Sequence, residues 1–129
     1  MRRHGRGAGG RGRGRRAVRM LEPVLLLLLH HGPAHGYTFL ERFDEFRLED
    51  LDSSVVYRAL RDMEERAWVT STWDEEQTQG PPRRVYRLTA QGDEVLRWYM
   101  EDLEEARAMI DHLLGAYNRH MERGEGEHH

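Results

Sequence analysis

Apolar positions divide the first half of the chain into three helical segments. Residues 20–31 are apolar almost all round, which predicts a buried helix that ends at Gly32 and Pro33. A second helix is expected over about residues 35–47, because the apolar side chains recur there at a helical spacing. A third is expected over about residues 52–67, since Asp52 is a good N-cap.

The pattern then changes to strands and returns to a helix. Residues 69–73 and 84–88 alternate with a period of two, and the polar segment between them contains Gly80, Pro81 and Pro82. This combination predicts a β-hairpin with a long loop. Thr89 is then expected to cap a last helix that continues to about Met121. The order of elements predicts a mainly α protein with a small β-hairpin: a winged helix-turn-helix followed by a long C-terminal helix.

The last helix has the most regular apolar spacing in the chain. Its apolar residues recur at alternating intervals of three and four, which is typical of the a/d seam of a coiled coil. The seam consists of Leu96, Tyr99, Leu103, Ala106, Ile110, Leu113 and Tyr117. Because few other elements remain to cover it, the sequence predicts a homodimer formed through this helix. A seam packed within one chain is the alternative.

These elements predict four parts of the chain. Residues 18–89 form the winged helix-turn-helix domain and residues 90–121 form the dimerisation helix. Residues 1–17 are an arginine- and glycine-rich tail, expected to be disordered because it has almost nothing apolar to bury, and residues 122–129 form a second disordered tail. The first tail can bind nucleic-acid phosphates without sequence preference. A tail that only raises solubility is the alternative.

Charge is distributed unevenly along the chain. Residues 1–19 carry 8 arginines and no acid, whereas residues 20–129 carry 12 arginines against 23 acids, a net charge of -11. The chain contains no cysteine, which excludes disulfides, thiolate nucleophiles and the usual zinc-finger ligand sets. A folded part this acidic requires any nucleic-acid contact to come from a local basic surface.

Several classes of protein are excluded by what the sequence lacks. The longest apolar run, residues 24–29, is far shorter than the roughly 20 residues of a membrane span, and the basic first residues lack the apolar core of a signal peptide. The chain has no phosphate-binding glycine loop, Ser53 and Ser54 have no histidine near them in the sequence, and no histidine pair has metal-ligand spacing. We therefore expect a cytoplasmic protein that is not an enzyme and has no cofactor or metal.

The third helix carries the strongest candidate for a nucleic-acid interface. Opposite its apolar stripe lie Ser53, Ser54, Tyr57, Arg58 and Arg61. Small residues allow a helix to approach bases, and arginine reaches guanine edges or phosphates. The acids that follow would repel DNA, so the N-terminal half of the helix is expected to bind it. An ordinary solvated face is the alternative.

Arginines at the exit of the hairpin loop form a second candidate contact. Arg83 and Arg84 are consecutive there, and Arg87 follows. A hairpin beside a recognition helix can place such side chains on the phosphates of a groove. Pairing with the acids at the other end of the loop is the alternative.

Four motifs lie in order over about residues 20–117: Leu21-Glu22-Pro23 before the leucine run, Gly32-Pro33-Ala34-His35-Gly36-Tyr37, Val56-Tyr57-Arg58-Ala59-Leu60, and Arg84-Val85-Tyr86-Arg87-Leu88-Thr89 with Gly92. Together these motifs resemble the PadR family of bacterial transcription regulators. The resemblance implies a winged helix-turn-helix and a single C-terminal dimerisation helix, as in the short form of the family. It also implies binding to a palindromic operator, usually repression, and often release by a small hydrophobic effector.

The resemblance also assigns residues by position. Ser53, Ser54, Tyr57 and Arg58 correspond to the DNA-reading helix, Arg83 and Arg84 to the wing, and His35 and Tyr37 to a phosphate contact at the start of the second helix. Ser53 and Ser54 replace the usual proline or glycine. Multidrug-binding members have a tryptophan in the dimer interface where this chain has Leu103, which argues against the same stacking site.

The function expected from the sequence is that of a homodimeric DNA-binding regulator of a pseudo-palindromic operator. Its two recognition helices would enter successive major grooves about 34 Å apart. A winged-helix protein-interaction module is one alternative, supported by the acidic folded part. A nonspecific nucleic-acid binder that acts through the Arg/Gly tail is the other.

Overall fold

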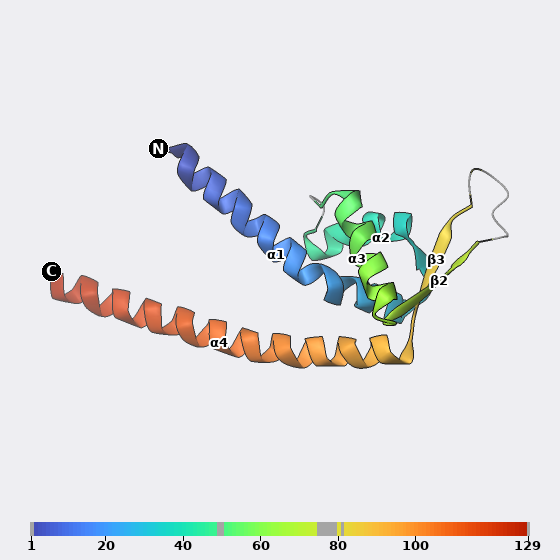
Figure 1. Ribbon diagram of the computed structural model, residues 1–129. Helices are drawn as coiled ribbons and strands as arrows, with labels where there is room; N and C mark the ends of the chain where they lie inside the picture. The colour runs from blue at the N-terminus through green and yellow to red at the C-terminus, as the bar shows by residue number, and fades with distance from the viewer. Residues whose placement is uncertain (1, 49–50, 75–79, 81, 129) are drawn as a thin grey trace. The chain divides into compact units, whose positions relative to one another are not determined.

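The computed structural model describes residues 2–48, 51–74, 80 and 82–128, and it divides into two compact units, Met1–Leu96 and Arg97–His129 (Figure 1). The elements in chain order are α1 (Arg2–His31), β1 (Ala34–His35), α2 (Gly36–Arg42), the 3₁₀ helix η1 (Phe43–Phe46), α3 (Ser53–Glu65), β2 (Val69–Trp73), β3 (Arg84–Leu88) and α4 (Ala90–His128). The fold is mainly helical with a small antiparallel sheet, which confirms the predicted fold class.

The first unit is built around an apolar core contributed by all of its helices. Leu25 of α1, Phe39 of α2 and Leu60 of α3 are fully buried. Burial of each such side chain contributes about 1.5–3 kcal/mol. Among the residues that the structure describes, no buried side-chain nitrogen or oxygen lacks a hydrogen-bond partner. The apolar stripes predicted for the three helices therefore converge on one core.

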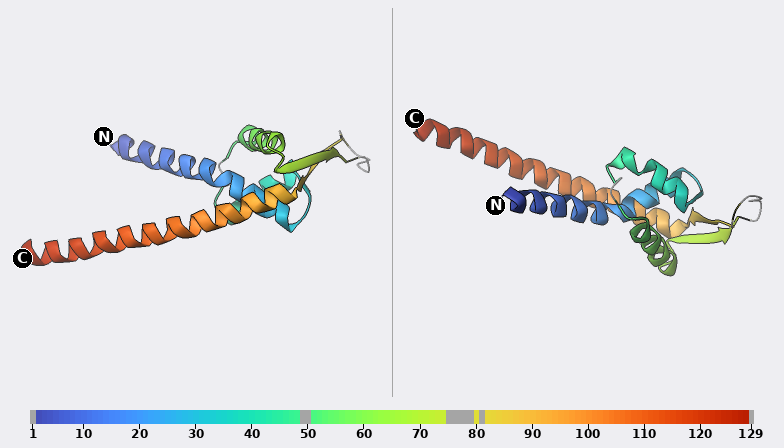
Figure 2. Two further views of the ribbon diagram at one scale, coloured as in Figure 1. Left: turned by 60° about the horizontal axis from the view of Figure 1, so that its bottom comes forward. Right: turned by 90° about the horizontal axis from the view of Figure 1, so that it is seen from above.

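The sheet has three antiparallel strands in the order β1-β3-β2. The register of β2 and β3 places Ser71 opposite Tyr86 and Trp73 opposite Arg84. Both views in Figure 2 show this hairpin extending away from the helices as an arm, the wing of the fold. The sequence predicts β2 and β3 but misses β1, because a strand of two residues is defined only by its pairing with β3.

The helix predicted over residues 35–47 is shorter in the structure. It continues only from Gly36 to Arg42 as α2, and η1 follows it. Arg47 then adopts a left-handed backbone conformation with φ of 61° and donates its N–H to carbonyls of η1. The apolar spacing does not reveal this change from an α-helix to a 3₁₀ helix, because side chains three residues apart share a face in both helix types.

The predicted start of the third helix agrees with α3. Asp52 is the N-cap, and its carboxylate accepts a hydrogen bond from the backbone N–H of Ser54 at 3.3 Å. A cap of this kind stabilises a helix by about 1 kcal/mol. The N-terminus of α3, which is the candidate reading end, is therefore held in a defined conformation.

Helices extend into both segments that the sequence predicts to be disordered. Helix α1 begins at Arg2, within the predicted tail of residues 1–17, and α4 continues to His128, within the predicted tail of residues 122–129. Backbone hydrogen bonds can extend an existing helix one residue at a time without an apolar face.

The junction between the wing and α4 depends on Thr89. Its hydroxyl donates to the carbonyl of Trp68 and accepts from the N–H of Gly92, both at 2.9 Å, so it caps α4 as predicted. Gly92 is buried against the Trp68 carbonyl, where a Cβ would not fit. The close approach of the two backbones thus explains why position 92 is a glycine.

None of the helices described here is both long and apolar enough to cross a membrane.

Candidate nucleic-acid interface

The exposed face of α3 consists of the residues predicted to read DNA. Ser53, Ser54, Tyr57, Arg58 and Arg61 are all exposed. The opposite face of the helix is fully buried through Val56, Leu60 and Met63. This contrast holds α3 against the core with its polar and cationic side outward.

Arg58 is one of two exposed cations on this face, together with Arg61. No hydrogen bond or ion pair joins its exposed guanidinium to any other residue within the described part of the chain. Its planar fork could form two parallel hydrogen bonds with a guanine edge or a phosphate. The acids Asp62 and Glu65 are exposed near the C-terminal end of α3, away from its first turns.

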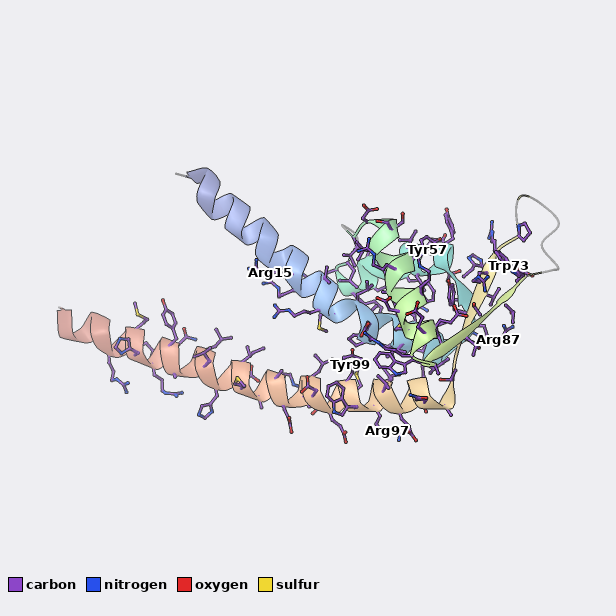
Figure 3. All side chains as sticks on the ribbon, in the orientation of Figure 1. Arg15, Tyr57, Trp73, Arg87, Arg97 and Tyr99 are labelled. Carbon is purple, nitrogen blue, oxygen red and sulfur yellow. The ribbon has the colours of Figure 1, made fainter. Side chains whose placement is uncertain are left out.

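Five of the predicted residues meet at an open hollow beside α3. The hollow measures about 290 Å³ and lies where β1, α2, α3 and the wing come together. Its lining residues are His35, Gly36, Tyr37, Tyr57, Pro82, Arg83, Arg84 and Tyr86. Figure 3 shows Tyr57 on α3 and Trp73 toward the open end of the hairpin. The tertiary structure thus brings together residues that are up to 49 positions apart in the sequence, from His35 to Arg84.

Arg83 and His35 are paired at the edge of this hollow. An Arg83 Nη1–H donates to His35 Nε2 at 3.3 Å, which requires the neutral imidazole with its proton on Nδ1. The other ring nitrogen lies 3.5 Å from the Thr38 hydroxyl. Arg83 remains exposed, so it can neutralise an anion that approaches the hollow while the imidazole holds it beside α2.

Tyr57 lies directly over the backbone of Gly36. A Cβ at position 36 would overlap the Tyr57 ring, although Gly36 itself has an ordinary negative φ. The absence of a side chain at Gly36 therefore lets the tyrosine of α3 rest on the first turn of α2. This contact sets the position of a side chain that is 42% exposed on the outward face of α3.

The other two wing arginines are bound to the sheet. Arg84 is half-buried, donates to the Ser71 hydroxyl at 2.8 Å and stacks over the Trp73 ring at 4.4 Å. Arg87 donates to the Thr72 hydroxyl at 3.0 Å. The sequence analysis missed Ser71 and Trp73 as partners, and only the strand register, which places Trp73 opposite Arg84, could have revealed them.

Tyr86 is one of the residues that line the hollow, and it is buried. Burial raises the pKa of its phenol above the usual 10.0, and the nearby Glu64 carboxylate raises it further. Tyr86 therefore remains neutral wherever DNA binding would be measured. Its role in the hollow is that of an uncharged wall.

The seam residues of α4 differ in their exposure. Leu96 is buried in the core of the first unit, and Tyr99, Leu103 and Ala106 are half-buried. The open part of the seam in the second unit is Ile110, Leu113 and Tyr117, with Leu113 at 68% exposure. Leu114 and Met121 extend this face and were not predicted, because a strict a/d count omits neighbouring positions.

The histidines do not gather with acids into a metal site in the described residues, where no group of three such side chains could hold an ion. His30 instead lies 3.2 Å from the Asp93 carboxylate at the start of α4. This contact joins the end of α1 to the first turn of α4 within the first unit.

Comparison with known proteins identifies similar chains of known fold. A solved PadR family transcriptional regulator from Eggerthella lenta is 21% identical, with a TM-score of 0.76 over 88% of this chain and 97% of that one. A PadR-like transcription factor from Bacteroides fragilis is 29% identical, with a TM-score of 0.65 over 78% and 95% of the two chains. A proposed transcriptional regulator from Thermoplasma acidophilum is 30% identical, with a TM-score of 0.68 over 78% and 96%.

None of the curated proteins compared with this chain matches it. The model of the transcriptional regulator PadR-like family, by contrast, matches residues 24–98, which extend from the buried part of α1 through the wing into α4. That range includes every residue of the candidate interface. The chain therefore belongs to the PadR-like family of transcriptional regulators.

Proposed function

We propose that the protein is a homodimeric repressor that reads a pseudo-palindromic DNA operator with α3. The main support is the convergence of His35, Tyr37, Tyr57 and Arg83 on one hollow, together with the exposed guanidinium of Arg58 on α3. Donors from three separate elements then face one surface, as recognition of a DNA backbone and groove requires.

Each part of this surface has a distinct role in the proposal. Ser53 and Ser54 let the capped N-terminus of α3 enter the major groove, and Arg58 contacts a base edge. Tyr37 and Arg83 contact phosphates on either side of that groove. The exposed acids at the far end of α3 keep that end away from the backbone by repulsion.

The dimer forms through α4. Ile110, Leu113, Leu114, Tyr117 and Met121 expose a contiguous apolar stripe, which water disfavours on an isolated helix. A second copy of the same stripe covers it in a two-fold arrangement, so the two copies of α3 read half-sites about 34 Å apart. A small hydrophobic effector that binds near this interface would alter that spacing and release the protein from its operator. The protein would act in the bacterial cytoplasm.

A winged-helix module that binds another protein is the second candidate function. It is favoured by the net charge of -11 over residues 20–129, which opposes binding to a polyanion. A nonspecific nucleic-acid binder acting through the basic N-terminal segment is the third. Arg15, Arg16 and Arg19 of this segment are exposed on α1.

Selection of bound duplexes from a random pool tests these functions together. The repressor should enrich a two-fold symmetric sequence, and deletion of residues 1–16 should leave that preference intact. Loss of all binding on deletion would support the nonspecific binder, and absence of binding by the full chain would support the protein-interaction module.

The selected duplex then tests the recognition helix. Arg58→Ala should weaken its binding by about 1–3 kcal/mol. The control is Arg107→Ala, which removes the same charge from an exposed position of α4 where Arg107 pairs with Glu104 at 3.4 Å. Equal binding by the parent and Arg58→Ala would refute the assignment of α3.

A further inference from the structure

A chain of three side-chain contacts joins the recognition helix to the wing. The Ser71 hydroxyl on β2 donates to the Glu64 carboxylate on α3 at 2.7 Å. The same oxygen accepts a hydrogen bond from Arg84 Nη1 on β3 at 2.8 Å, and the Arg84 guanidinium covers the Trp73 ring at 4.4 Å. We call Glu64, Ser71, Arg84 and Trp73 the wing relay.

Glu64 determines the orientation of the Ser71 hydroxyl in the wing relay. A serine hydroxyl has one proton to donate and two lone pairs. Because the proton points to the carboxylate, a lone pair is left to accept from Arg84. Without the carboxylate the hydroxyl can rotate, and its proton can then face the guanidinium.

The surroundings of Arg84 differ from those of Arg83. The Arg84 guanidinium is half-buried, with one edge on Ser71 and one face on an indole. Arg83 is exposed, and the one partner described for its guanidinium is a neutral imidazole. An arginine that uses its planar fork and its face within the protein holds two elements together, whereas an exposed one is available to an anion.

We propose that Arg84 is a positioning residue that sets the wing relative to α3 through the wing relay, and that Arg83 is the wing arginine that contacts DNA. The proposal rests on the proposed DNA-binding function. The relay fastens β2 and β3 to the C-terminal half of α3, so the wing and the reading face keep a constant separation when they meet the duplex. Glu64 thus favours binding of a polyanion although it is itself an anion.

The sign of the effect at position 64 tests the proposal. Glu64→Ala removes a negative charge, so electrostatics alone predicts tighter binding to the selected duplex. The relay predicts weaker binding by roughly tenfold, because the hydrogen-bonded chain to the wing is lost. Glu65→Ala is the matched control, since the neighbouring Glu65 is exposed on the same helix and should give equal or tighter binding. Tighter binding by Glu64→Ala would overturn the proposal.

Lysine substitutions separate positioning from phosphate contact. Lysine keeps the charge but loses the fork and the stacking plane. Arg83→Lys should therefore stay within about threefold of the parent, because a point charge suffices for a phosphate. Arg84→Lys should bind as poorly as Arg84→Ala, whereas parent-like binding by Arg84→Lys would overturn the positioning role.

The relay can also be observed without DNA. The chain has 3 tryptophans, so the indole N–H signal of Trp73 in a nitrogen-15 correlation spectrum can be assigned with Trp73→Phe. Glu64→Ala should shift this signal and Glu65→Ala should not. An unmoved signal overturns the relay even if the protein binds DNA. A shifted signal in a protein that binds no DNA overturns the proposed function, and with it the role of Arg84 in binding.

Discussion

Substitution of Gly36 by alanine tests how α2 positions the face of α3 that is proposed to read DNA. The added methyl group would overlap the Tyr57 ring, so the ring must leave its place over the first turn of α2. Because Tyr57 is already 42% exposed, the ring can swing into solvent without displacing the core. The structure therefore predicts a local change on the surface proposed to bind DNA.

Two opposing terms determine the change in stability. Alanine at a helical position is favoured over glycine by up to about 1 kcal/mol. Overlap in a packed site costs about 1–3 kcal/mol, and a ring that can move outward brings this cost to the lower end of that range. The free energy of unfolding should therefore change by less than about 1 kcal/mol. Affinity for the selected duplex should fall by about tenfold, because the Tyr57 hydroxyl loses its place beside the backbone.

Urea denaturation and fluorescence polarisation with the selected duplex measure the two quantities separately. Gly32→Ala is the control, since a Cβ there would meet nothing within 4 Å. In a Tyr57→Ala background the added methyl group meets no ring, so Gly36→Ala should neither destabilise the fold nor weaken binding further. If Gly36→Ala binds DNA as Gly32→Ala does, the argument that Gly36 positions Tyr57 is refuted.

Four further results are expected. Leu60→Ala should lower the free energy of unfolding by about 2–5 kcal/mol in urea denaturation, because this side chain is fully buried. Thr89→Val should destabilise the fold by about 1 kcal/mol through loss of the α4 cap, with an unchanged value counting against that cap. Because the pKa of Tyr86 is raised, its contribution to stability is complete below pH 10.0 and is lost above it. Above pH 10.0 the free energy of unfolding of Tyr86→Phe should therefore fall less steeply than that of the parent. Leu113→Asp should convert a dimer to a monomer in light scattering, whereas Met109→Asp, outside the seam, should not.

The sequence predicts much of the secondary structure because its signals are local. Helical spacing, the Asp52 cap and the alternation on either side of the hairpin loop each depend on a few neighbouring residues. The exposed face of α3 follows from the same periodicity, since burying Leu60 on one side turns Arg58 to the other. The order of these elements is also enough to indicate a winged helix-turn-helix.

Contacts between distant residues have no such local signal. The sequence places Arg83 and Arg84 together as phosphate contacts, yet their side chains have different surroundings once β3 pairs with β2. Similarly, Leu96 shares the heptad spacing of the seam but is buried in the first unit. A periodic pattern shows which residues share a face, and it does not show what covers that face.

The sequence by itself thus determined the main helices and the two hairpin strands, their order and the polar face of α3, because periodicity and capping act over a few residues. Only the tertiary structure decided that Tyr57 rests on Gly36, that Arg83 meets His35 and that Glu64 reaches the wing through Ser71. The physical reason is that hydrogen bonds, stacking and steric fit depend on distances of a few ångströms between residues far apart in the chain. Such distances are established only when the core and the sheet have formed.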